Sequence, residues 1–396
     1  MKTLLSSGLA FCVFLMATCP VCAQTWTQTS APFGAWDSVA SSADGNNLIV
    51  ATFLHTIYTS TNSGITWMSN TVPPAVWNSV ASSPDGFLLV ASGSGAVGGV
   101  YVSTNGGATW AIPPGANGLL PGGQIVVSAN GDIMFAANAA VTDNLFFIST
   151  NAGATWTSKS IPFGAIAALA SSADAKKLVA VGGADSLIFT STNSGDTWVS
   201  NNVPSEPWSS VATSADGKTL AAVWQGCIYT STNYGGAWSP ANVPFFHWNS
   251  VVSSADGTKL VAVGYNRFTG GSDEPIYVST NSGATWTSNA SLGGLSFAYL
   301  ASSADGNKLV AADQGGAIYT SFTIPEPQLN LVPTNGNLAL SWIVPSTNFV
   351  LQQNPDLTTE NWTDVTNEPV LNLTNLQDEV KLPLPASNCF YRLATQ

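Results

Sequence analysis

Four carboxylates outside any repeated pattern are the residues of this chain best suited to acid–base chemistry. They are Asp37, Glu206, Asp273 and Glu274. Hydrolysis of a glycosidic bond needs one such group as acid and another as base, with one of them kept protonated by burial or by a neighbour. Because the spacing of the four suggests no matched pair, we predict no turnover of glycans.

The other residue types that build reactive centres are scarce. His55 and His247 are the only histidines, and they fall in different repeats, which argues against a zinc site and against a histidine-based triad. Once a leader is removed, Cys227 and Cys389 remain, one in a predicted strand and one in the C-terminal region. We therefore expect neither a mutual disulfide nor a catalytic thiol, and we expect no cofactor and no metal ion.

A repeated octapeptide indicates the elements that must position these residues. Ser60 to Trp67 reads Ser-Thr-Asn-Ser-Gly-Ile-Thr-Trp, and its copies begin 40 to 48 residues apart and end at Trp67, Trp110, Trp156, Trp198, Trp238 and Trp286. A turn residue between the first two predicted strands of each repeat occurs seven times, at Asp44, Asp85, Asn130, Asp174, Asp216, Asp256 and Asp305. Each repeat then reads as four strands, which predicts one blade of an all-β propeller.

The N-terminal end of the predicted propeller supplies what the last repeat lacks. The seventh repeat stops at Ser321 without an octapeptide, whereas residues 25–28 match residues 155–158, which open a fourth strand. We predict that residues 25–28 pair with residues 317–321. Such pairing would close a seven-bladed ring and remove exposed sheet edges.

The octapeptides resemble the Asp-box (BNR) repeat of sialidase-like propellers, Ser-x-Asp-x-Gly-x-Thr-Trp, although Asn stands in the Asp position of all six copies. The resemblance implies the fold. It does not imply sialidase activity, since those enzymes need three arginines and this chain has only Arg267 and Arg392. Xyloglucan-degrading relatives use two propellers, and photosystem assembly factors of similar repeat type carry an arginine cluster that is missing here.

The repeated side chains are interpreted as structural. Ser and Asn of the octapeptide can bond the turn backbone, Gly can take a positive φ and Trp can pack between strands, so we do not expect carbohydrate sites there. The aspartates of the Asp-Gly hairpins are interpreted as turn formers, because one carboxylate per hairpin does not supply the several oxygens that calcium requires.

Variable loops make one face of the predicted propeller the candidate binding surface. We call the side with the first hairpins and octapeptides the turn face, and the opposite side the loop face. Trp36, Trp77, Trp208 and Trp248 share one repeat position, which favours packing between blades but leaves open that they are exposed platforms for sugars or Pro-rich peptides. The candidate ligand-binding residues are Trp36, Trp77, Trp208, Trp248, Tyr265, Arg267, Phe268, Asp273 and Glu274.

Charge separates the two predicted faces. The net charge is −12, which argues against nucleic-acid binding. The loop face carries Asp143, Asp185, Glu206, Asp273, Glu274 and Asp313, whereas the turn face carries Lys176, Lys177, Lys218, Lys259 and Lys308. If this asymmetry is functional, the loop face attracts a cationic partner or a divalent ion.

The ends of the chain predict export and a second domain. Residues 1–23 read as a signal peptide cleaved after Ala23, 24–323 as the propeller, 324–328 as a Pro-rich linker and 329–396 as a small β-sandwich-like domain resembling modules on secreted bacterial repeat proteins. No membrane span is expected. We predict a secreted, non-catalytic propeller that binds an extracellular polysaccharide or protein, with surface attachment through the C-terminal domain. The alternatives are a glycoside hydrolase or lyase with an atypical carboxylate pair, and a structural component of the cell envelope.

Overall fold

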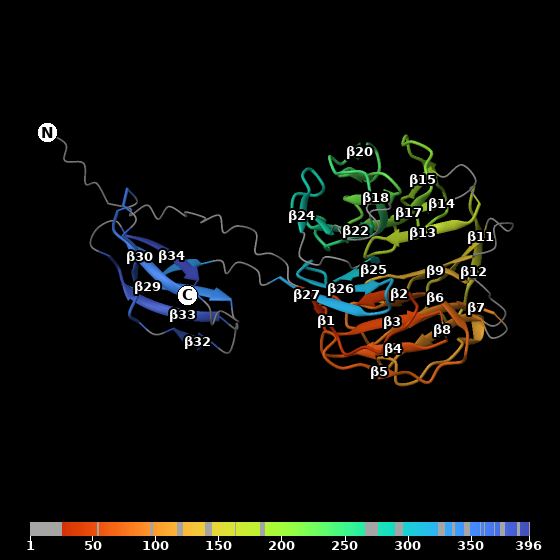
Figure 1. The fold of residues 1–396 in the computed structure, drawn as a ribbon, viewed down its shortest axis with the longest axis horizontal. Coiled ribbons are helices and arrows are strands. Elements are labelled where there is room, and N and C mark those ends of the chain that lie inside the picture. The colour runs from red at the N-terminus through yellow and green to blue at the C-terminus, as the bar shows by residue number, and fades with distance from the viewer. Residues whose placement is uncertain are drawn as a thin grey trace. The chain divides into compact units, whose positions relative to one another are not determined.

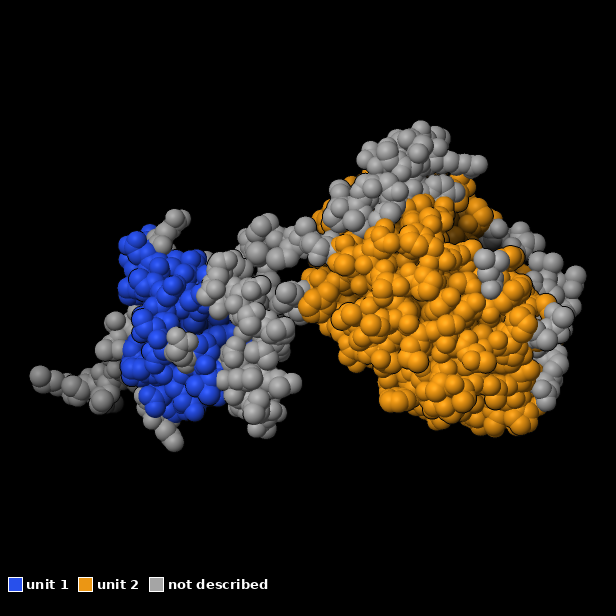
Figure 2. Space-filling view, turned by 60° about the horizontal axis from the view of Figure 1, so that its bottom comes forward, with its two compact units in different colours: residues 1–22, 324–396 blue, residues 23–323 orange. Residues whose placement is uncertain are grey.

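The computed structural model divides the chain into two compact units, residues 23–323 and residues 1–22 with 324–396 (Figure 2). It describes residues 26–53, 55–95, 98–116, 122–138, 145–162, 164–182, 187–265, 276–289, 296–323, 329–334, 337–343, 349–356, 358–359, 361–367, 369–372, 377–385 and 389–395. Within these ranges, no helix has the length and apolar character needed to cross a membrane.

The described strands of the larger unit form seven antiparallel sheets, numbered here along the chain. The first three are β2 (Trp36–Ser41), β3 (Leu48–Thr52), β4 (Ile57–Ser60) and β5 (Met68–Ser69); β6 (Val76–Ser82), β7 (Leu89–Ser94) and β8 (Gly99–Ser103); and β9 (Gly122–Val127), β10 (Met134–Asn138), β11 (Leu145–Ser149) and β12 (Thr157–Ser160). The fourth and fifth are β13 (Ile166–Ser171), β14 (Leu178–Gly182), β15 (Leu187–Ser191) and β16 (Val199–Ser200), and β17 (Trp208–Thr213), β18 (Leu220–Trp224), β19 (Ile228–Ser231) and β20 (Ser239–Pro240). The sixth is β21 (His247–Ser253), β22 (Leu260–Tyr265), β23 (Ile276–Ser279) and β24 (Thr287–Asn289), and the seventh is β25 (Phe297–Ser302), β26 (Lys308–Asp313), β27 (Ile318–Phe322) and β1 (Trp26–Gln28).

Burial within each sheet explains the residue pattern of its strands. All five residues of β3 are buried, because neighbouring sheets cover both of its faces. In β2 only Trp36 and Val39 are buried and the other four residues are half-buried, and the two residues of β5 are exposed. The apolar run therefore marks the second strand of each repeat, while the polar fourth strand lies at the rim (Figure 1).

The innermost strands β2, β6, β9, β13, β17, β21 and β25 pack against one another in order, and β25 also packs against β2. Apolar clusters fill the junctions between sheets. One cluster joins Trp36 and Val50 of the first sheet to Val310 and Ile318 of the seventh. The unit therefore has a ring of cores between sheets rather than one central core, which is the arrangement of a β-propeller.

The N-terminal strand completes the seventh sheet, as expected from the sequence. Trp26 pairs with Ser321 and Gln28 with Tyr319 in an antiparallel register, so β1 lies beside β27 (Figure 1). The side chain of Trp26 is 7% exposed, and its ring centroid lies 5.2 Å from that of Phe297. Strand pairing and aromatic packing thus both hold this end of the chain in the ring.

The smaller unit contains two further antiparallel sheets. One is β28 (Asn330–Thr334), β29 (Asn337–Ile343), β33 (Gln377–Pro383) and β32 (Val370–Asn372), and the other is β31 (Thr363–Asp364), β30 (Phe349–Asn354) and β34 (Phe390–Thr395). Leu340 and Trp342 of the first share a buried cluster with Leu351 of the second.

Candidate functional site

The turn face holds neighbouring sheets together through a ring of backbone hydrogen bonds. The residue before each turn Asp or Asn donates its N–H to the equivalent carbonyl of the next sheet, at 2.7–2.9 Å. The donor and acceptor pairs are Ala43 to Pro84, Ala129 to Ala173, Ala173 to Ala215, Ala215 to Ala255, Ala255 to Ala304 and Ala304 to Ala43. Pro84 has no N–H, so the junction between the second and third sheets lacks this bond.

Side chains on the turn face form a second ring. The residue just before the second strand of the fourth sheet reaches over the turn glycine of the fifth: a Cβ on Gly217 would lie 2.6 Å from Cδ of Lys177. Lys177 Nζ also donates to the Asp216 carbonyl at 2.6 Å, and Lys308 Nζ donates to Asn46 Oδ1 at 2.7 Å. Lys177 and Lys308 therefore join neighbouring sheets to one another.

The turn aspartates lie in short polar networks of their own hairpins. The Ser83 hydroxyl donates to Asp85 Oδ1 at 2.5 Å and the Phe87 N–H donates to it at 3.0 Å. These hydrogen bonds, with the serine bond the largest cause, hold the pKa of Asp85 below its usual value, and the same causes act on Asp174 and Asp216. Their role is that of turn formers, as the sequence indicates.

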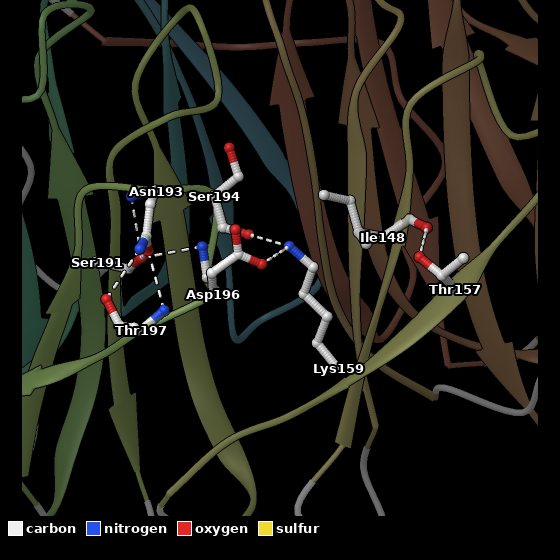
Figure 3. A network of polar contacts seen from close by, with 9 residues as sticks. Ile148, Thr157, Lys159, Ser191, Asn193, Ser194, Asp196 and Thr197 are labelled. Carbon is white, nitrogen blue, oxygen red and sulfur yellow. Dashed lines mark hydrogen bonds and ion pairs between the residues drawn. The ribbon is translucent and has the colours of Figure 1, made fainter.

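The octapeptides are also turns rather than open sites. In the fourth sheet the Ser191 hydroxyl donates to Asn193 Oδ1 at 3.0 Å, and that oxygen accepts the Thr197 N–H at 2.9 Å (Figure 3). Figure 3 also shows Lys159 of β12 reaching across to Asp196, with Nζ 2.6 Å from Oδ1. Asn193 forms these bonds through its amide oxygen, so the turn does not require a carboxylate at this position.

The four tryptophans predicted as ligand platforms are buried. Trp36 and Trp208 are 7% and 4% exposed, and Trp77 and Trp248 are 0% exposed. Trp36 Nε1 donates to the Gly316 carbonyl at 2.8 Å, and the ring of Trp77 meets Tyr101 edge-on at 5.2 Å. A sugar cannot stack on a ring with no accessible face, so these side chains pack between sheets, and their burial contradicts the prediction that they are ligand platforms.

The remaining predicted residues are only partly described. Tyr265 ends β22, where it pairs with His247 through the backbone. Arg267, Phe268, Asp273 and Glu274 lie outside the described residues. Among the described carboxylates, Asp37 lies in the first sheet and Glu206 precedes the fifth, two sheets that do not pack on each other. The structure therefore does not bring these two together as an acid–base pair.

Exposed aromatic side chains on the loop face lie outside the set of ligand-binding residues predicted from the sequence. Phe33 is 73% exposed, Phe53 52% and Phe245 57%, and Trp224 is half-buried with its ring 6.5 Å from that of Phe245. The Phe53 N–H donates to the Ala35 carbonyl, so the loops that carry Phe33 and Phe53 meet, while Trp224 and Phe245 form a second pair at the fifth and sixth sheets. We call Phe33, Phe53, Trp224 and Phe245 the loop-face aromatic set. A signal existed, because Pro-Phe recurs at residues 32–33, 162–163 and 244–245.

The innermost strands carry a recurring β-bulge near the loop face. In the first sheet the register shifts between Trp36 and Ser38, which makes Asp37 the bulged residue, and five other sheets shift at the equivalent place. Such bulges re-aim a side chain. Burial raises the pKa of Asp37, and it also raises that of Tyr299 in the adjoining sheet, to which the Asp37 charge adds. Within the described ranges, no three His, Cys, Asp or Glu side chains gather to hold a metal ion.

Comparison with known proteins identifies the fold but no family. No family model matches the chain, and no curated protein sequence does. Among solved structures, YCF48 from Cyanidioschyzon merolae is similar at a TM-score of 0.57 and 15% identity, over 75% of this chain and 98% of that one. A second structure, described as YCF48 bound to D1 peptide, is similar at a TM-score of 0.57 and 18% identity, over 76% and 97% of the two chains. These likenesses, at such low identity, show that this chain has the fold of a β-propeller.

Proposed function

We infer that this protein is a non-catalytic binding scaffold that holds a polypeptide partner on its loop face. The observation that carries this conclusion is the loop-face aromatic set, three of whose members leave half or more of the side chain in solvent. Exposed aromatic groups supply large contact areas in protein recognition. The turn-face hairpins are bonded to one another between sheets, although Phe87 is exposed there, whereas the loop face carries the irregular loops, so we assign binding to the loop face.

A polypeptide fits the loop face better than the other partners considered. Phe33 and Phe245 each follow a proline and are exposed, so each ring can contact an apolar side chain of a bound peptide. One of the structurally similar propellers is described as bound to a peptide, which supports the same class of partner here. A polysaccharide is the alternative that the experiment below must separate.

The wider setting of the proposal follows from the sequence. The chain would be a seven-bladed propeller of the Asp-box, sialidase-like type, exported by residues 1–23 and closed by its N-terminal strand. The C-terminal domain would attach it to a surface. Glycoside hydrolase or lyase activity stays the alternative: of its four candidate carboxylates only Asp37 and Glu206 are described, and they belong to sheets that do not pack together. A purely structural role in the cell envelope would not account for the exposure of the loop-face aromatic set.

The test is binding to arrays of 12-residue peptides and of glycans, with affinities of selected ligands measured by calorimetry. Phe245→Ser, combined with Phe33→Ser, should weaken the best peptide at least tenfold. Phe87→Ser is the matched control, because Phe87 is 62% exposed on the turn face, and it should leave the affinity unchanged. Binding of glycans alone, or loss of binding in the Phe87 variant instead, would contradict the proposal.

A further inference from the structure

The junction that closes the ring encloses a cavity at the turn face. Where the first sheet packs on the seventh, this cavity measures about 270 Å³, and Leu48, Ser63, Lys308 and Thr320 are among the residues that line it. The equivalent residues between the fourth and fifth sheets leave a space of only about 10 Å³. A cavity of about 150 Å³ can hold a benzene ring, so the space at the closing junction is large enough for one aromatic group.

The two junctions differ at the fourth position of the octapeptide. This position is Tyr234 in the fifth sheet and Ser63 in the first. The backbone is alike at both, with φ of +61° at Tyr234 and +56° at Ser63. The Tyr234 N–H donates to the Lys218 carbonyl at 3.0 Å, and the Ser63 N–H donates to the equivalent carbonyl of Asn46 at 2.9 Å. Only the side chain therefore separates the two positions.

Tyr234 shows what such a junction can hold. Its ring lies over the ammonium group of Lys177, with Nζ 4.6 Å from the ring centroid, which is a cation–π contact. Lys308 is the equivalent of Lys177, because each extends its stem over the turn glycine of the following sheet. The closing junction thus has the same cation, but it has a serine where the other junction has the ring.

The surroundings of Lys308 fit a neutral aromatic ring. Its Nζ donates to Asn46 Oδ1 at 2.7 Å and to Ser63 Oγ at 3.3 Å, which are neutral acceptors. Among the described residues, no carboxylate forms an ion pair with it. The ring of Phe322, which is 47% exposed, has its centroid 5.9 Å from Nζ. The negative face of a further ring complements this ammonium, and Leu48 offers that ring apolar contact.

We propose that the cavity beside Lys308 is a binding site for one aromatic ring of the phenol type. The ring takes the place that Tyr234 has at the other junction, and the hydroxyls of Ser63 and Thr320 in the lining suit a polar substituent on it. Such a ring can come from a small phenolic compound or from a tyrosine side chain of a polypeptide. The site lies on the turn face and is independent of the binding proposed for the loop face.

The experiment measures binding of p-cresol to the full mature chain by saturation-transfer NMR and by the shift in Tm. Ser63→Tyr reproduces the arrangement at Tyr234, so it should keep the fold, fill the cavity and weaken p-cresol at least tenfold. Tyr234→Ser removes the ring from the other junction. It should create a second site, and p-cresol should then raise Tm by more than it does in wild type.

Two controls identify what the site recognises. 4-Methylcyclohexanol has the size of p-cresol but no aromatic face, and it should bind at least about threefold more weakly. Lys308→Met keeps an apolar stem over Gly45 and removes the charge, so it should abolish the preference for p-cresol. N-acetyltyrosinamide separates the two sources, because it should bind more tightly than p-cresol if the natural ligand is a tyrosine side chain and more weakly if it is a small phenol.

The results separate this site from the loop-face function. Failure of p-cresol to bind wild type, or binding that Ser63→Tyr leaves unchanged, would overturn the site. Equal affinity for p-cresol and 4-methylcyclohexanol would also overturn it, because an apolar space would then explain binding without the cation. The variant with Phe33→Ser and Phe245→Ser should bind p-cresol as wild type does, whatever it does to peptide binding.

Discussion

Replacement of Trp26 by alanine tests how firmly the N-terminal strand closes the ring. The side chain is 7% exposed and packs on Phe297, within a cluster that includes Val261 and Leu309 of the sixth and seventh sheets. Its indole nitrogen has no hydrogen-bond partner among the described residues, so the loss is one of packing alone. Truncating a buried Trp costs about 3–5 kcal/mol. At about 2–4 °C per kcal/mol, Tm should fall by roughly 6–20 °C.

The assay is thermal unfolding followed by circular dichroism and by Trp fluorescence. Thr27→Ala is the matched control: Thr27 lies on the same strand, pairs with Thr320 and is exposed, so its side chain contributes within about 0.5 kcal/mol. Deletion of residues 24–30 should be more harmful than Trp26→Ala, since it also removes the backbone pairing with β27. A Trp26→Ala protein that melts within a degree of wild type would refute the reasoning.

Two further predictions concern the turn face. Gly86→Ala should destabilise the fold by about 2 kcal/mol or more, because φ is +75° and a Cβ there would collide with Asn47 of the first sheet. The control Gly95→Ala, with φ +98° and open space around the Cβ, should cost only the backbone strain of about 1–2 kcal/mol. Urea unfolding of the two variants measures the difference, and equal effects would count against a close contact between sheets at Gly86. The pKa of Asp85 is held below its unfolded value chiefly by the hydrogen bond from Ser83, so ionised Asp85 stabilises the fold above about pH 4 and this stabilisation is lost as the pH falls through the lowered pKa. Ser83→Ala should therefore make the free energy of unfolding depend less steeply on pH between about pH 5 and 2. An unchanged pH dependence would show that this hydrogen bond does not couple the ionisation of Asp85 to folding.

The periodic features of the chain were predictable because each repeat confirms the others. The octapeptide turns, the Asp-Gly hairpins and the pairing of β1 with β27 follow from local residue chemistry repeated at a constant spacing. Trp26 could be recognised as a fourth-strand residue because it matches the copy at Trp156. Sequence periodicity alone could not settle whether Trp36 and its equivalents were exposed, since a tryptophan packed between sheets and a tryptophan exposed on the surface would both recur once per repeat.

The candidate site depends on features that occur in single repeats. Trp224 stands where the first and second sheets have Thr52 and Gly93, so no repetition marked it. The residues of such a site differ from their equivalents in the other repeats, so their role can be inferred only when the neighbouring strands in the structure are known.

Hydrogen exchange of the mature protein with and without its best array peptide tests the central claim most directly. The account predicts that bound peptide slows exchange of loop-face amides, above all in residues 31–37, 52–53, 224–227 and 243–248, and leaves the turns at residues 83–88 and 213–219 unchanged. Protection confined to the turn-face hairpins, with the loop-face amides exchanging as they do in the free protein, would contradict it.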